Sequence, residues 1–179
     1  MKQLIEFTIP FIGLKQGEHL FDFKIDDTFF QNFEYEEFHS VSVDAKVKMQ
    51  KKANGLEFDF SIKGTVNLNC DLTNEAYDQP VKGKYRLTVN FGNEYNDDED
   101  GLLIIPHGSY EINIQQYLYE LIVLSVPVKR IHPGIADGTL DSEILKKLEE
   151  LKPKPLEEKT PKEETDPRWD KLKKLLTDK

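Results

Sequence analysis

The chain has 179 residues, of which 38% are hydrophobic, and this is enough for one domain with a single core plus a tail. Its single cysteine excludes an intramolecular disulfide and a zinc site made of four cysteines, and it is typical of a reducing compartment. The net charge of -9 arises in the first 140 residues, which carry 22 acidic and 13 basic side chains, because the remainder carries 11 of each. Such a body repels a polyanion on average, so contact with a nucleic acid requires a local basic surface.

The apolar segments of the chain do not predict export or insertion into a membrane. Glu6 and Pro10 interrupt the first apolar segment. The longest apolar run, residues 121–128, contains Ser125 and Pro127 and is too short to cross a bilayer. We therefore expect a cytoplasmic protein without a membrane contact.

Apolar and polar residues alternate along the first part of the chain, which is the period of a strand with one buried face. Residues 5–11 and 21–25 predict two strands joined by a turn at 15–17. The phenylalanine-rich segment after Thr28 fits a short helical turn. Residues 41–49 predict the next strand, and Asn54-Gly55 predicts a hairpin because both residues tolerate a positive φ.

Residues 56–70 predict a long return strand whose even-numbered positions are apolar and end at Cys70. The thiol is therefore expected on the core face. Gly64 interrupts the pattern and indicates a bend or a bulge. After a polar connection at 71–80, residues 81–91 supply another set of inward side chains. Together these segments predict an antiparallel meander that curves toward a partial barrel.

The second part of the chain predicts one main helix. Residues 92–101 read as an acidic loop and residues 102–105 as a short strand. Asn113 and Gln116 resemble a capping box at the start of a helix near 113–126, which ends before Pro127. The predicted fold class is α+β and mostly β: an antiparallel meander or partial barrel packed with one main helix, followed by a helical C-terminal tail.

Four parts follow from this pattern. We expect a β-rich domain over residues 1–138, a peripheral helix over 139–152, a flexible linker over 153–165 and a short amphipathic helix over 166–179. The last helix carries Arg168 and Trp169, which are candidates for binding a partner because tryptophan is frequent at binding hot spots. Trp169 folding back onto the body is the alternative.

Residues with catalytic or metal-binding chemistry lack the partners that such chemistry needs. No base or cation lies beside Cys70 in the sequence. Residues 96–101 copy the first half of a calcium loop, but its twelfth position is His107 instead of a bidentate glutamate. His107 and His132 are not at ligand spacing from other candidates. We expect no enzyme, no metal and no cofactor.

Basic residues occur at alternate, outward positions of three predicted strands. If these strands are neighbours, their outer face is a basic patch suited to phosphate contact. Alternatively, the lysines only keep the sheet soluble, and Glu57 and Asp59 dilute their charge. The candidate residues are Lys46, Lys48, Lys63, Lys82, Lys84 and Arg86.

Three segments of the sequence resemble the YceD family, the large ribosomal RNA subunit accumulation proteins. They are VNLNCDLTNEAYDQPVKGKYRL at 66–87, INIQQYLYELIVLSVPVKRIHPG at 112–134 and DPRWDKLKKLL at 166–176. Relatives often carry a Cys-x-x-Cys pair in the first segment, and here Cys70 and Thr73 occupy its two positions. Pro127, His132 and Pro133 occupy the motif positions of the second segment.

The resemblance implies a non-enzymatic factor in ribosome biogenesis that supports accumulation of large-subunit (23S) rRNA. Its direct partner is either the rRNA or an assembling, basic ribosomal protein. Binding of RNA predicts a strong dependence on salt and on the basic patch, whereas binding of a basic protein predicts a dependence on residues 97–100. A general protein adaptor, or a metal- or thiol-dependent sensor or enzyme, is the alternative.

Overall fold

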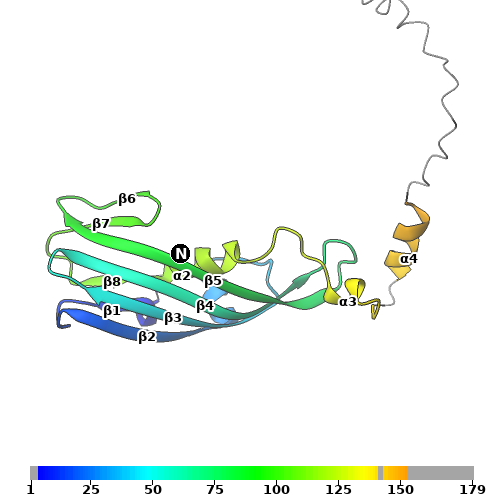
Figure 1. Ribbon diagram of the computed structural model, residues 1–179, viewed down its shortest axis with the longest axis horizontal. Coiled ribbons are helices and arrows are strands. Elements are labelled where there is room, and N and C mark those ends of the chain that lie inside the picture. Colours follow the sequence, from blue (N-terminus) through cyan, green and yellow to red (C-terminus); the bar gives the residue numbers. More distant parts are fainter. Residues whose placement is uncertain (1–3, 141–142, 153–179) are drawn as a thin grey trace, which may run out of the picture. The chain divides into compact units, whose positions relative to one another are not determined.

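Figure 1 shows the computed structural model of the chain, which describes residues 4–140 and 143–152. The chain divides into two compact units, Met1–Ser142 and Glu143–Lys179. The second unit is described only around helix α4 (Glu143–Glu150). The predicted linker at 153–165 and the predicted terminal helix, with Arg168 and Trp169, lie outside the described residues.

The first unit is mostly β-structure, as the sequence predicts, and is built on a six-stranded sheet with the order β2-β3-β4-β5-β7-β6. Neighbouring strands are antiparallel except for β5 and β7, which run parallel. The strands are β2 (Gly17–Ile25), β3 (Ser40–Lys51), β4 (Gly55–Asn69), β5 (Ala76–Gly92), β6 (Asn96–Glu99) and β7 (Leu102–Pro106).

A small sheet and short helices complete the unit. Strands β1 (Thr8–Pro10) and β8 (Glu111–Asn113) pair with each other, and α2 (Gln115–Leu124) packs against β4 and β5. Helix α1 (Asp27–Gln31) contacts β3, and α3 (Pro133–Ala136) follows the loop after α2. No helix in the described part of the chain has the length and apolar content needed to span a bilayer.

The core lies on one face of the large sheet, and strict alternation along β3 and β4 creates that face. The odd positions 41–49 of β3 and the even positions 56–62, 66 and 68 of β4 are buried, and Cys70 is only 2% exposed. This confirms the predicted inward set of both strands. Each fully buried large apolar side chain stabilises the fold by about 1.5–3 kcal/mol, so the register of these strands is strongly specified.

The first predicted strand is shorter than the alternation suggests. Ile5–Phe7 form a 3₁₀-helical turn, and only Thr8–Pro10 are extended. This short strand pairs with β8 instead of with β2. Ile5 leaves the predicted inward set and is 90% exposed, whereas Phe7 stays buried with its ring centroid 5.4 Å from that of Phe23 and 4.9 Å from that of Phe29.

The predicted acidic loop at 92–101 contains strand β6, and the sheet is not a pure antiparallel meander. All four residues of β6 are exposed, so no apolar alternation signals the strand in the sequence. It forms because β7 offers a free edge, with which it pairs in an irregular register. The crossover through β6 places β7 parallel to β5, which overturns the all-antiparallel prediction.

Two glycines serve the sheet differently from the prediction. The β3–β4 hairpin is present, but neither Asn54 nor Gly55 has a positive φ. Gly64 shows no bulge, because its register with Val43 is continuous. A Cβ atom on Gly64 would lie 2.2 Å from the Ser42 backbone oxygen, and close approach of the backbones therefore explains this glycine.

The main helix begins later than predicted. Ile114 occupies the N-cap position, and Asn113, the last residue of β8, accepts a hydrogen bond of 3.0 Å from the Gln115 backbone N–H. Gln116 donates to Glu120 and does not return to Asn113, so the predicted capping box is not formed. The helix ends at Leu124, ahead of Pro127 as expected.

Substitution of Gly64 by alanine tests the close approach of β3 and β4. We expect Gly64→Ala to lower the free energy of unfolding by about 1–3 kcal/mol, because the added methyl group meets backbone atoms that cannot yield independently. Chemical denaturation followed by circular dichroism measures this loss. Gly13→Ala is the matched control, since a Cβ atom there meets nothing within 4 Å. Equal stability of both variants would contradict the packing argument.

Candidate functional site

The outer face of β3, β4 and β5 carries the six cationic residues that the sequence identified. The three strands are neighbours, and their register sets Lys46, Ser61 and Lys84 in one cross-strand row. Lys48, Asp59 and Arg86 form the next row. Lys63 lies opposite Lys82. Lys63 and Lys82 are therefore about 4.8 Å apart across neighbouring strands, and the two cations of each row are about 9.6 Å apart because a β4 residue lies between them. Outward neighbours on one strand are about 6.8 Å apart.

Two of these six cations, Lys48 and Arg86, form ion pairs with carboxylates. Lys48 donates to Glu18 at 2.7 Å, and this hydrogen bond raises the pKa of Lys48. Arg86 donates to Asp59 at 2.7 Å. Both pairs are exposed to solvent, which screens them, so they add little to stability. Within the described residues, no ion pair involves the other four cations, which are Lys46, Lys63, Lys82 and Lys84.

A shallow depression of about 580 Å³ lies at the centre of this face. Leu20 on β2, which is 70% exposed, adds one apolar side chain to it. No outward side chain of β3, β4 or β5 at the described positions is aromatic. The depression is bordered by Lys46, Lys48, Asp59, Ser61, Lys84 and Arg86, and Phe60 and Tyr85 also line it, although both belong to the inward sets of β4 and β5. This composition suits contact with phosphate groups and offers no platform for stacking bases.

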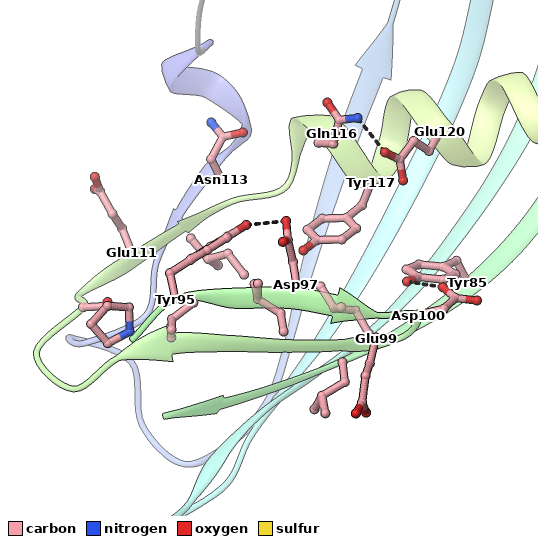
Figure 2. A pocket seen from close by; sticks show the side chains of 17 residues that line it. Tyr85, Tyr95, Asp97, Glu99, Asp100, Glu111, Asn113, Gln116, Tyr117 and Glu120 are labelled. Atoms are coloured by element: carbon pink, nitrogen blue, oxygen red, sulfur yellow. Dashed lines mark hydrogen bonds between the residues drawn. The ribbon is translucent and has the colours of Figure 1, made fainter. Parts of the chain in front are cut away.

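A second cavity, of about 480 Å³, lies on the other side of β5, between β6, β7, β8 and α2. We call it the acidic groove. Figure 2 shows Tyr117 projecting from α2 toward the strand that carries Asp97, with Tyr95 beside it. Its floor is apolar and includes Leu87 and Leu103. Its carboxylates are Asp97, Glu99, Asp100, Glu111 and Glu120, and its tyrosines are Tyr85, Tyr95 and Tyr117.

Hydrogen bonds fix the tyrosines and carboxylates of the acidic groove relative to one another. The Tyr85 hydroxyl donates to Asp100 at 3.0 Å and accepts from the Gly101 N–H, also at 3.0 Å. The Tyr95 hydroxyl donates to Asp97 at 2.9 Å. Burial, followed by the hydrogen bond to Asp100, raises the pKa of Tyr85, so this phenol stays neutral and the carboxylates alone set the charge.

Two of the three segments that resemble the family, residues 66–87 and 112–134, meet around Cys70. The thiol accepts a hydrogen bond of 3.3 Å from the His132 backbone N–H, although 62 residues separate them in the chain. Burial alone would raise the pKa of the Cys70 thiol. Hydrogen bonds from the Thr73 side chain and from backbone N–H groups outweigh this effect, so the pKa lies below its ordinary value. Thr73, the second motif position, is also buried.

Two hydrogen bonds between Asp71 and Arg130 hold the same junction together. The Asp71 N–H donates to the Arg130 oxygen at 2.7 Å, and the Arg130 N–H donates to the Asp71 carboxylate at 2.8 Å. Arg130 also pairs with Glu37 at 2.8 Å. The His132 ring accepts from the Gly134 N–H at 2.9 Å and caps α3, whose first residue is Pro133. His132 and Pro133 therefore have structural roles at the start of α3. Pro127 is exposed and lies in the loop between α2 and α3.

A family model described as Large ribosomal RNA subunit accumulation protein YceD matches residues 58–176. The chain belongs to the YceD family. The match covers most of β4, all of β5 and the acidic groove, and the junction residues Cys70 and His132, and it confirms the resemblance seen in the sequence. No curated protein and no solved structure matches the chain.

Sequence reasoning placed the basic face and named residues 97–100 as the candidate for binding a basic protein, but it did not predict the groove that these residues help to line. The six cations share a face because period-2 alternation and hairpin connections specify their positions. The groove instead combines Tyr85 with Asp100 and Tyr117, which come from a strand, an edge connection and a helix. The signal available in the sequence was the concentration of carboxylates at 97–100.

Thiol labelling tests the packing of the Cys70 junction. We expect the folded protein to react with a disulfide reagent at least about a hundredfold more slowly than the unfolded chain, because labelling needs local opening. Asp71→Ala removes the hydrogen bond from Arg130 and is expected to accelerate labelling about tenfold, for a loss of about 1.4 kcal/mol. The release of the coloured thiolate measures the rate.

Asp22→Ala is the control for this experiment, because Asp22 lies on the outer face of β2, away from the junction. Fast labelling of the folded wild-type protein would show that Cys70 is accessible, against the structure.

Proposed function

We propose that this protein is a cytoplasmic, non-enzymatic factor in ribosome biogenesis that supports accumulation of large-subunit rRNA. In this proposal it contacts the rRNA directly, through the phosphates, with the outer face of β3, β4 and β5. Membership of the YceD family supports the biological role. The observation that supports the mechanism is the group of four cations on one face of an otherwise acidic body that make no ion pair with any residue described by the structure.

The arrangement of the cations favours backbone contact over reading of bases. Lys82 and Lys84 are successive outward residues of β5, Lys46 lies on β3 and Lys63 lies on β4. The spacing of about 6.8 Å between outward residues of one strand is comparable to that between successive phosphates along a nucleic-acid strand. Recognition of single-stranded RNA generally uses stacking on aromatic side chains, which this face lacks. Structured, double-helical rRNA is therefore the form that this face fits best.

The surroundings of Cys70 argue against the thiol-dependent alternative. A reactive or metal-binding thiol needs access to its substrate, and this side chain is almost completely buried. Its sulfur accepts hydrogen bonds from Thr73 and from the His132 N–H, which hold the junction together. The thiol is best explained as part of the fold.

Measurement of rRNA in cells tests the biological role. We expect cells that lack the protein to contain a lower ratio of large-subunit to small-subunit rRNA, and the wild-type gene to restore it. The variant Lys82→Gln/Lys84→Gln should restore the ratio less well. A normal ratio in cells without the protein would overturn the proposed role.

Salt titration tests direct binding of RNA. We expect Lys82→Gln/Lys84→Gln to weaken binding of a large-subunit rRNA fragment and to reduce the slope of log affinity against log salt by roughly one unit for each lysine lost. Filter binding over a series of salt concentrations measures both quantities. Lys15→Gln/Lys129→Gln removes the same charge from exposed positions elsewhere. The same loss in both variants would show that only bulk charge matters.

A further inference from the structure

The acidic groove lies on the opposite face of β5 from the cations of the outer face. Along this strand, Lys84 and Arg86 point outward, whereas Tyr85 and Leu87 line the groove. A ligand in the groove and an RNA on the outer face therefore occupy different surfaces. Two partners can bind at the same time without competing for residues.

The groove has a single sign of charge. Five of its lining residues are carboxylates, and none of the lining residues is a lysine, an arginine or a histidine. A cleft with one sign of charge and low-dielectric walls concentrates the electrostatic field and attracts a ligand of the opposite sign. Leu87, Leu103, Ile105 and Ile112 supply such walls. The groove therefore repels RNA and attracts cations.

The tyrosines give the groove a second property that a plain acidic surface lacks. Tyr85 and Tyr117 lie nearly parallel, with an angle of 17° between their rings and 6.2 Å between their centroids. Within the described residues, the Tyr117 hydroxyl has no hydrogen-bond partner. Burial, followed by nearby groups that include Asp97, raises the pKa of Tyr117, so this phenol remains neutral. Neutral aromatic faces beside fixed carboxylates suit guanidinium groups, which stack on rings and form paired hydrogen bonds with carboxylates.

We propose that the acidic groove binds an arginine- and lysine-rich segment of another protein. The hydrogen bonds from Tyr85 to Asp100 and from Tyr95 to Asp97 orient two carboxylates before the ligand arrives. Each of these carboxylates keeps further acceptor positions for a guanidinium. The C-terminal part of the same chain is a poorer ligand, because residues 141–179 carry as many acidic as basic side chains.

This inference rests on the proposed function only for the identity of the partner. In ribosome assembly, the segment would belong to a basic ribosomal protein that binds the same rRNA. The groove and the outer face can then bring a protein and its RNA together on one scaffold. Binding to the groove does not require the outer face, so the two proposals fail separately.

Fluorescence anisotropy with a defined peptide tests the inference on the full chain. The probe is a labelled peptide of alternating arginine and serine, and the matched probe contains glutamine in place of arginine. We expect only the arginine peptide to bind. The variant Asp97→Asn/Asp100→Asn/Glu120→Gln should weaken its binding at least about tenfold, since the neutral groups keep the shape and lose the charge.

The control variant Glu6→Gln/Glu36→Gln/Asp137→Asn removes the same charge from exposed positions outside the groove. It should change the affinity by no more than about twofold, because salt screens distant charges. Thermal melts of both variants check their folding. Similar losses in the two triple variants, or equal binding of the glutamine peptide, would overturn the proposal.

Two further measurements separate this proposal from its alternatives. RNA affinity should not fall in the groove variant, and peptide affinity should not fall in Lys82→Gln/Lys84→Gln. RNA binding that is lost together with peptide binding would mean that the groove does not act as a separate site. Crosslinks between the groove and residues 166–179 of the same chain that added peptide fails to displace would identify the tail as the occupant and overturn the inference.

Discussion

The structure depends on the burial of one face of three long strands. Because β3, β4 and β5 alternate strictly, every apolar side chain placed in the core sends its neighbours to the outer face. A shift of register by one residue would expose Phe58 and Phe60 and bury the charged positions between them. The energy that fixes the core therefore also fixes where the cations lie. The position of the cations on the outer face is therefore a consequence of core packing.

This dependence explains which features the sequence predicts well. Alternation from Leu56 to Cys70 specifies both the burial of the thiol and the outward direction of Lys63, since a local period carries the information. Strand β6 lacks such a period, because none of its residues is buried and only the edge of β7 induces it. The hairpin at Asn54-Gly55 was predicted for its turn chemistry. Its glycine is instead required by the Val89 backbone oxygen, 2.5 Å from a Cβ atom at that position.

The Cys70 junction and the acidic groove illustrate a different limit of local patterns. Each combines residues from segments separated by tens of positions, such as Cys70 with His132 and Tyr85 with Tyr117. Composition and periodicity describe each segment alone and do not report which segments meet. Family resemblance named both blocks of the junction without indicating their contact. The structure shows that one backbone N–H on a buried sulfur joins them, and that Asp71 and Arg130 reinforce the join.

The charge of the whole chain fits a protein that handles RNA and a basic protein on opposite faces of one sheet. A uniformly basic factor would coat any RNA, because phosphate contact is independent of sequence. Here the net charge of -9 opposes general association, so the proposed RNA contact is limited to the outer face of β3, β4 and β5, where four of the cations lack an ion pair among the described residues. The acidic groove adds to this repulsion of RNA, and the basic segment proposed for it would therefore bind without competition from RNA. Because a single strand, β5, supplies side chains to both surfaces, their relative position is set by the pleat of the backbone and needs no flexible hinge.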